Sequence, residues 1–297
     1  MKCGSTSLVS GLGLSGHPEL VAAEFEGFGD LELESLTWHI LLRRRWVNRF
    51  NARVANLSRR SADFVLVGLK NPWYVWNEVL LHALSTVPGL RLVLVVRDPL
   101  DALSSVYFHY HAGVSPEKRP SFAACVQKLG SNCFSLGSSW CTTAQESCVH
   151  FTPGWLKAYR MASLAQGAIR YFGPDRVRVV HSDNFARSPR TAFNRVAAWL
   201  GATKPFAENV HFQKENLFAS KYWYATRGTA GPCLQRQQDL RVWRHAERLC
   251  APRNAGAVRM LLHRFAAEYR GLARLLRASG EPVPYFLSRH VARCAIR

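Results

Sequence analysis

The stretch LRLVLVVRDP, residues 90–99, decides how this chain folds. Its apolar run is short, continuous and rich in β-branched residues, which is typical of a strand buried on both faces of a parallel sheet. The proline suits the first turn of a helix, because its ring presets φ and no N–H donor is needed there. We therefore predict a strand over 90–96 and a helix over 100–110, with Pro99 in the first turn.

The same alternation of short apolar runs and helical patterns repeats along the chain. Short apolar runs over 64–69 and 177–180 predict two more buried strands. Helical patterns over 77–85, 153–172 and 189–200 separate or follow the strands, and each ends near a glycine or a Pro-Gly pair. This alternation predicts an α/β fold, a layered sandwich around a central parallel sheet.

The chain of 297 residues, with 48% hydrophobic residues, is long enough for one large domain, and we predict a single domain over 1–297. The segment 111–152 interrupts the strand–helix rhythm and is interpreted as a long insertion. The tail over 206–297 is basic and aromatic, with helices expected around 235–250 and over 254–278.

The net charge of +19, from 39 Lys and Arg against 20 Asp and Glu, favours an anionic partner: nucleic acid, anionic lipid or acidic polysaccharide. An arginine-biased composition explains the excess equally well. No nucleic-acid recognition motif is present, so no specific nucleic-acid partner is expected. There is no apolar stretch of about 18 residues and no secretory signal pattern.

Eight cysteines are present, and four of them crowd into the insertion. No CxxC pair occurs and the histidines lack finger spacing, so no metal site is predicted. Disulfides in an oxidising compartment are favoured over buried free thiols. The sequon at Asn56 is compatible with a lumenal, glycosylated protein. The clustered cysteines are Cys125, Cys133, Cys141 and Cys148.

The segment KCGSTSL, residues 2–8, has the composition of a phosphate-binding loop. Glycine lets backbone N–H groups turn toward an anion, hydroxyls add donors, and a following helix offers its positive N-terminal end. The lysine precedes the glycine, so this is not a Walker A loop. On its own, an ordinary Gly-Ser turn explains the segment as well. The candidate ligands are Lys2, Gly4, Ser5, Thr6 and Ser7.

A second candidate phosphate site follows the strand over 90–96. Arg97 stands at the carboxyl end of that strand, where ligands of open α/β sheets bind. Ser105, eight residues on, falls about two turns into the next helix. An arginine fork and a hydroxyl donor together suit a phosphate group.

The two segments, in this order and about ninety residues apart, strongly resemble the sulfotransferases that use 3′-phosphoadenosine 5′-phosphosulfate. In that family a K-x-G-[TS]-T-[SA]-L loop holds the 5′-phosphosulfate, and an R-D-P strand end with a later serine holds the 3′-phosphate. The segments HPE (17–19), KNPWY (70–74), YFGPDRV (171–177) and SDNF (182–185) also match family segments in order. The resemblance spans roughly residues 1–200.

The resemblance is strongest to the Golgi carbohydrate branch, in particular the subgroup that sulfates N-acetylgalactosamine 4-sulfate in chondroitin. It implies a polysaccharide acceptor, acidic or neutral, and no metal. It also implies catalytic roles for Lys2, for Lys70 and for a carboxylate base. Glu24 takes the position of that base, but the flanking Lys and His of the family pattern are absent, so Glu26 is the alternative. A basic C-terminal loop of the family places Lys221 at the 3′-phosphate.

In this family a buried strand precedes the phosphosulfate loop, whereas this chain begins at the lysine of the loop. We therefore expect the first strand, a stem and a membrane anchor to precede this sequence, and the protein to work in the Golgi lumen. Two other classes stay open. One is a P-loop kinase-like phosphotransferase, although no acidic Mg²⁺ ligand is evident after a strand. The other is a non-catalytic polyanion-binding protein, a decayed enzyme that uses only its basic surface.

Overall fold

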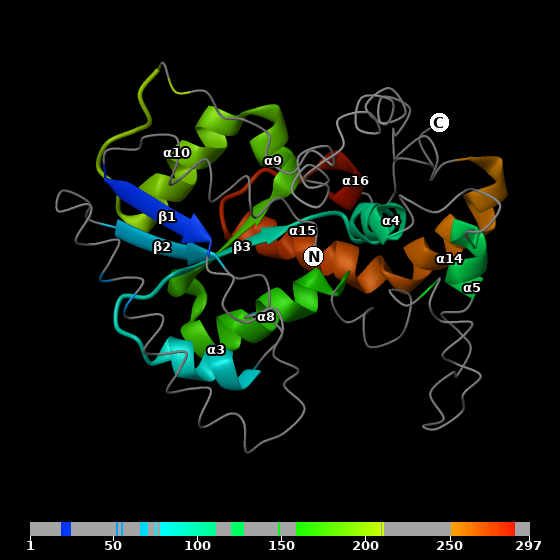
Figure 1. The fold of residues 1–297 in the computed structure, drawn as a ribbon, viewed down its shortest axis with the longest axis horizontal. Coiled ribbons are helices and arrows are strands. Elements are labelled where there is room, and N and C mark those ends of the chain that lie inside the picture. The colour runs from blue at the N-terminus through cyan, green and yellow to red at the C-terminus, as the bar shows by residue number, and fades with distance from the viewer. Residues whose placement is uncertain are drawn as a thin grey trace, which may run out of the picture. The chain divides into compact units, whose positions relative to one another are not determined.

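Figure 1 shows the computed structural model of the chain, which describes residues 19–24, 52, 55, 66–70, 75, 78–110, 120–127, 148, 159–208, 210 and 251–288. The described residues of 81–183 and 251–288 form one compact unit. Those of 19–80 and 184–210 form a second unit. The two units therefore interleave along the sequence, and each is described by itself.

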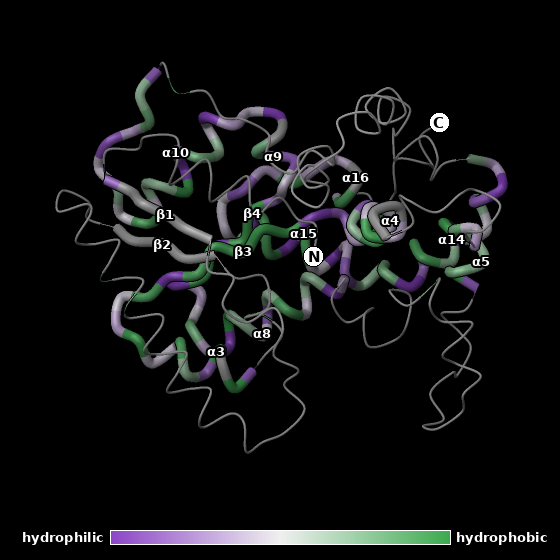
Figure 2. The backbone as a smooth tube through the Cα atoms, in the orientation of Figure 1, coloured by the Kyte–Doolittle hydropathy of each residue, from purple (hydrophilic) through white to green (hydrophobic). Residues whose placement is uncertain are grey.

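The sheet of the first unit pairs β3 (Leu92–Val96) with β4 (Val177–His181) in parallel. The register runs from Leu92 opposite Val177 to Val96 opposite His181. Both strands were predicted from their apolar runs, and Figure 2 shows β3 as a hydrophobic segment of the backbone. Parallel strands need a crossover connection, and the long segment between these two contains the helix α8 (Met161–Phe172), which packs against β4.

The helices α3 (Glu78–Ser85), α4 (Pro99–Tyr110) and α8 (Met161–Phe172) precede or follow these strands along the chain. The first two confirm the predicted helices, with the proline at the start of α4. The predicted helix over 153–172 is wrong in its start: Arg160 precedes α8 with non-helical dihedrals, φ −81° and ψ 61°. The end of that helix, before Gly173 with φ 79°, is as predicted.

A carboxylate from a distant helix explains where α8 begins. Glu268 accepts hydrogen bonds from the backbone N–H groups of Ala162 at 2.9 Å and Ser163 at 3.3 Å, and from the Ser163 hydroxyl at 2.6 Å. These N–H groups have no partner inside the helix, so a carboxylate there satisfies them and complements the helix dipole. The cap lies 106 positions away in sequence, beyond the reach of any local signal.

The predicted helix over 254–278 is two helices. The short η7 (Pro252–Asn254) leads into α14 (Ala255–Arg264), and α15 (Ala266–Ala278) follows after a break at Phe265. The ring of Phe265 is buried and its dihedrals, φ −94° and ψ 6°, lie outside the helical well. Neither Gly nor Pro stands at this break, so no local sequence signal predicts it. A short helix, α16 (Tyr285–Ser288), packs against α15.

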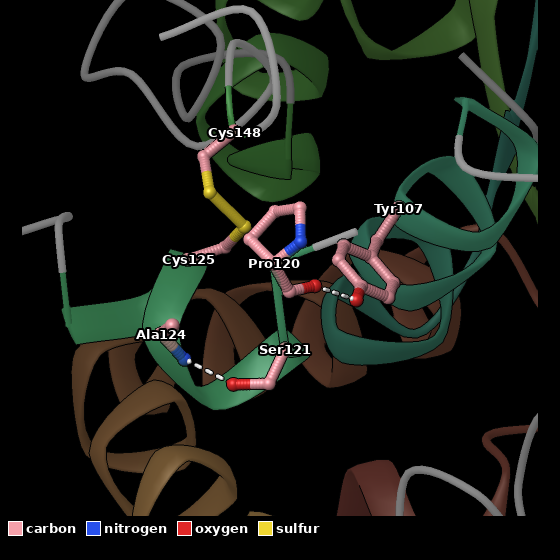
Figure 3. Close-up of a disulfide and its surroundings, with 6 residues drawn as sticks. All are labelled: Tyr107, Pro120, Ser121, Ala124, Cys125 and Cys148. Atoms are coloured by element: carbon pink, nitrogen blue, oxygen red, sulfur yellow. Dashed lines mark hydrogen bonds between the residues drawn. A yellow bond between two sulfur atoms is a disulfide. The ribbon is translucent and has the colours of Figure 1, made fainter. Parts of the chain in front are cut away.

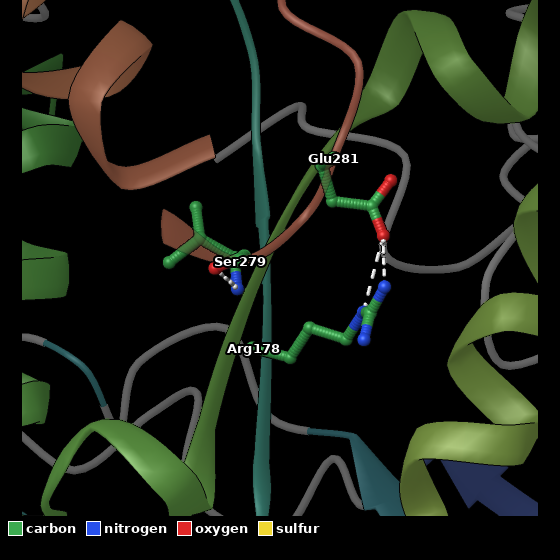
Figure 4. Close-up of polar contacts among 4 residues, drawn as sticks. Arg178, Ser279 and Glu281 are labelled. Atoms are coloured by element: carbon green, nitrogen blue, oxygen red, sulfur yellow. Dashed lines mark hydrogen bonds and ion pairs between the residues drawn. The ribbon is translucent and has the colours of Figure 1, made fainter. Parts of the chain in front are cut away.

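The end of α15 is joined to β4 by polar contacts (Figure 4). Arg178 pairs with the carboxylate of Glu281 at 2.6 Å, and both side chains are largely buried. The backbone N–H of Val179 donates to the Ser279 hydroxyl at 3.2 Å. Since breaking a buried ion pair leaves an uncompensated charge, these contacts fix the chain that leaves α15 against the strand.

The insertion contains more structure than predicted. It includes α5 (Phe122–Gln127), and a disulfide joins Cys125 to Cys148, as expected for a cysteine-stapled segment (Figure 3). The Tyr107 hydroxyl of α4 donates to the carbonyl oxygen of Pro120, just before α5. The disulfide therefore links two parts of the insertion, while the hydrogen bond from Tyr107 ties the residue just before α5 to α4, and α5 itself packs against α14. The pairing of Cys133 and Cys141 lies outside the described residues.

The second unit contains a parallel pair, β1 (Leu20–Glu24) with β2 (Leu66–Lys70). The strand β2 was predicted, but β1 was not, because its sequence LVAAE is short and contains two alanines of low strand propensity. The chain passes between the units along α9 (Ser182–Arg187), which follows η6 (Pro174–Arg176) and β4. The predicted helix over 189–200 is confirmed as α10 (Pro189–Leu200), which ends at Gly201 with φ 109°.

Candidate functional site

The carboxyl end of β3 carries the first candidate residue. Arg97 follows the last residue of β3 directly, and its side chain is half-buried. Its backbone N–H donates to the sulfur of Met161 at 3.2 Å, which holds the strand end against the start of α8. Arg97 therefore stands at the edge of the sheet where ligands bind in open α/β folds.

Asp98 has a structural role, unlike the preceding Arg97. It is 3% exposed, and its Oδ1 accepts the backbone N–H groups of Leu100 at 2.8 Å and Asp101 at 3.0 Å. It also accepts the hydroxyl of Tyr269 at 2.9 Å. Asp98 thus caps the N-terminus of α4 and turns the chain from strand to helix. Desolvation, with the charge of Asp101 as the next cause, raises the pKa of Asp98 to about 7.

Ser105 lies in the second turn of α4 and is half-buried. Within the described part of the chain its hydroxyl makes no hydrogen bond, whereas the hydroxyl of neighbouring Ser104 is buried and donates to the Asp101 carbonyl at 3.1 Å. The Ser105 hydroxyl can therefore donate to a ligand, whereas the Ser104 hydroxyl is used in a hydrogen bond within α4. Arg97 and Ser105 share one strand–helix connection, and this donor set suits a phosphate group.

His181 was not among the predicted site residues. This residue ends β4, pairs in register with Val96, and is fully buried. The backbone N–H of Asp183 donates to its Nδ1 at 3.1 Å, so the neutral imidazole carries its proton on Nε2. The only sequence signal was a polar residue closing an apolar strand, which by itself does not distinguish a structural from a functional side chain.

The second unit brings Glu24 and Lys70 together at the backbone. They are the last residues of β1 and β2 and are partners in the parallel register. Neighbouring strands lie about 4.8 Å apart, so the two residues share the carboxyl edge of this sheet. Glu24 was predicted from the family pattern as the candidate base, and in the structure it is the last residue of β1.

Glu19 stands directly before β1 in the HPE segment. Its carboxylate accepts the backbone N–H groups of Thr203 at 2.6 Å and Lys204 at 3.1 Å, and the Thr203 hydroxyl at 2.6 Å. The hydrogen bond from the Thr203 hydroxyl, followed by that from Lys204, lowers the pKa of Glu19. These bonds tie the start of β1 to the turn after α10, so Glu19 positions the strand that ends in Glu24.

The remaining candidates lie outside the described residues, so their predicted roles stay predictions. No group of three His, Cys, Asp or Glu side chains that could hold a metal ion occurs among the residues that the structure describes. No helix in the ranges given above is long and apolar enough to cross a bilayer. The candidates concerned are Lys2, Gly4, Ser5, Thr6, Ser7, Glu26 and Lys221.

No protein-family model and no curated protein sequence matches this chain. Thirteen chains of solved structures match it in fold. One is a sulfotransferase from Alicyclobacillus acidocaldarius, with a TM-score of 0.51 and 16% sequence identity over 95% of this chain and 93% of that chain. At this identity the similarity speaks for the fold alone. The predicted α/β fold is confirmed, and it is the fold seen in that sulfotransferase.

Proposed function

We propose that this protein transfers a sulfuryl group from 3′-phosphoadenosine 5′-phosphosulfate to a hydroxyl of a carbohydrate. The observation that carries the proposal is the Arg97-Asp98-Pro99 turn at the carboxyl end of β3, in a fold shared with a sulfotransferase. Asp98 is buried as the cap of α4, so it holds in place the turn that carries Arg97 at the carboxyl end of β3.

The cofactor would be held in two places. Arg97 supplies a planar fork for the 3′-phosphate, and Ser105 adds a hydroxyl that no described residue engages. The loop of Lys2, Gly4, Ser5, Thr6 and Ser7 would hold the 5′-phosphosulfate through backbone N–H groups and hydroxyls. Lys221 is the candidate for closing over the 3′-phosphate.

The chain itself must orient the acceptor and move its proton. Bound 3′-phosphoadenosine 5′-phosphosulfate supplies the activated sulfuryl group. Glu24, at the carboxyl edge of the β1–β2 sheet, is the proposed base that accepts the proton of the acceptor hydroxyl, with Glu26 as the alternative. Lys70, its register partner, and Lys2 would offset the negative charge that develops during transfer.

We propose an acidic or neutral polysaccharide as the acceptor and the Golgi lumen as the compartment. The charge of +19 supports an anionic acceptor, because a cationic surface concentrates anionic polymers around the protein. The Cys125–Cys148 disulfide supports an oxidising compartment.

A second candidate, a non-catalytic polyanion-binding protein, is favoured by the same charge of +19. It predicts polyanion binding without nucleotide binding. Binding of the nucleotide therefore separates the two candidates before any acceptor is known.

The test is calorimetric titration of 3′-phosphoadenosine 5′-phosphate into the full chain and into two single variants. Arg97→Ala removes the proposed phosphate ligand at the carboxyl end of β3. Arg91→Ala removes the same charge just before the amino end of that strand, where the side chain is exposed. We expect micromolar binding by the wild type and Arg91→Ala, and a loss of about tenfold or more in Arg97→Ala, since a charged hydrogen bond contributes about 1.5–3 kcal/mol.

Equal weakening by both variants would mean that only the overall charge attracts the nucleotide. Failure of the wild type to bind would favour the non-catalytic candidate. With binding established, Glu24→Gln and Glu26→Gln identify the base: the correct one should abolish transfer and leave nucleotide binding unchanged.

A further inference from the structure

An arginine-lined pocket lies on the outer face of α15, within the first unit. Its volume is about 330 Å³, and its lining comes from α15 and α16. The three arginines are exposed and Ala273 between them is buried. The lining residues are Arg270, Ala273, Arg274, Arg277 and Ser288.

The spacing of the three arginines makes a row. Positions i, i+4 and i+7 fall within about 60° of one another around a helix. At a rise of 1.5 Å per residue the row from Arg270 to Arg277 extends for about 10 Å. A single small ion occupies one point, whereas a row of this length matches an anion whose charges repeat along a chain.

The charge of this face is not balanced locally. The stretch 255–278 contains five arginines and one acidic residue, Glu268. Glu268 is buried and is occupied in capping α8. Of the residues that the structure describes, no carboxylate forms an ion pair with Arg270, Arg274 or Arg277.

Stability of the helix alone does not account for the row. The helix dipole favours a cation in the last turn, where Arg277 stands. Arg270 and Arg274 lie earlier, and like charges four residues apart repel each other. An anionic ligand across the three guanidinium groups would relieve this repulsion and use their fork geometry.

The neighbouring α16 contributes a hydroxyl to the pocket and carries an exposed aromatic ring outside its lining. Ser288 lines the pocket, and Tyr285 on the same short helix is 50% exposed. A membrane-docking face would need several exposed apolar side chains. In the described part of the chain the other exposed large apolar residues are Val79, Val87 and Met260, none of them on α15 or α16. Exposed arginines and a hydroxyl, without exposed apolar side chains in the lining, suit a sugar chain better than a lipid surface.

We propose that the row of Arg270, Arg274 and Arg277, with Ser288, is a binding site for an acidic polysaccharide, separate from the residues that carry the proposed transfer. The choice of a sugar over another polyanion rests on the proposed function. The site would hold a carboxylated or sulfated stretch of the glycan and so raise the residence time of a long acceptor.

The test compares three full-length proteins in binding a size-defined chondroitin sulfate oligosaccharide. One variant replaces Arg270, Arg274 and Arg277 with Gln. The matched control loses three exposed arginines elsewhere, through Arg187→Gln, Arg253→Gln and Arg259→Gln, so both variants have the same net charge. We expect the first variant to weaken binding about tenfold, at roughly half a kcal/mol for each exposed contact, and the control to stay within about twofold of wild type.

Equal weakening in both variants, or none in the first, would overturn the proposal. So would a first variant that loses binding to phosphatidylserine vesicles or to an oligonucleotide while it keeps oligosaccharide binding. Binding of 3′-phosphoadenosine 5′-phosphate is measured in parallel and should be equal in all three proteins. If the wild type does not bind the nucleotide, but only the first variant loses oligosaccharide binding, the proposed transfer is refuted. The proposed polysaccharide site is then still supported.

Discussion

The Tyr269 hydroxyl donates a hydrogen bond to Oδ1 of Asp98 at 2.9 Å, across 171 positions of sequence. Both side chains are buried. The bond connects α15 to the turn between β3 and α4, the turn that presents Arg97. Burial and the Asp98 charge, in that order, raise the pKa of Tyr269 well above its usual value, so this hydroxyl stays a donor at neutral pH. A C-terminal helix thus helps to position the candidate phosphate site.

Asp98 should make stability depend on pH. Its pKa is about 7 in the folded protein against 3.8 for an ordinary aspartate. The folded state then binds more protons than the unfolded state between these values, so the free energy of unfolding falls as pH rises from about 4 to about 7. A shift of this size corresponds to a loss on the order of 4 kcal/mol. The measurement is urea denaturation at pH 4–8 of wild type and Asp98→Asn.

The difference between the two curves should be largest at high pH, with Asp98→Asn the more stable at pH 8. Asp175→Asn, on an exposed residue, serves as the control and should parallel the wild type. A flat difference for Asp98→Asn across this pH range would show that the buried carboxyl is ionised at the same pH in both states.

Tyr269→Phe should destabilise the protein by about 1–3 kcal/mol at pH 8, because a buried carboxylate loses one of its three donors. Loss of this donor raises the pKa of Asp98 further, so the cost should be smaller at pH 5. The check is a double-mutant cycle with Asp98→Asn by chemical denaturation at both pH values. Additive effects would mean that the two side chains do not interact.

Gly271 lets α15 approach α8. A Cβ at this position would lie 2.7 Å from Cβ of Ala162, so Gly271→Ala forces the helices apart. We expect a loss of about 1–3 kcal/mol in the free energy of unfolding. Gly167→Ala, on the α8 side of the pair, meets nothing within 4 Å and should be neutral or stabilising by up to about 1 kcal/mol. Equal effects of the two substitutions would refute the close approach.

The Cys125–Cys148 disulfide should stabilise the folded protein by about 3 kcal/mol, because it closes a loop of 23 residues in the unfolded chain. The double variant Cys125→Ala, Cys148→Ala should melt at a lower temperature than wild type. A reductant should lower the melting temperature of the wild type toward that of the double variant, and it should change the melting temperature of the variant less. An unchanged melting temperature in the double variant would show that the link contributes no stability.

Local patterns determined much of this fold. The strands over 66–70, 92–96 and 177–181, and the helices that begin at Glu78, Pro99 and Pro189, were each predictable within about two residues. Apolar runs of β-branched residues, a proline in a first turn and a glycine after a last turn act through neighbouring residues, so one sequence suffices to find them. The position of Arg97 at a strand end followed from the same local reasoning.

Tertiary contacts decided the rest. The start of α8 depends on Glu268, the break before α15 on a buried Phe265, and the orientation of the Arg97 turn on Tyr269. The short strand β1 forms because it pairs with β2, and this pairing sets Glu24 opposite Lys70. Each contact joins residues that local periodicity cannot relate, because its energy comes from burial and hydrogen bonding that exist only once the chain is folded.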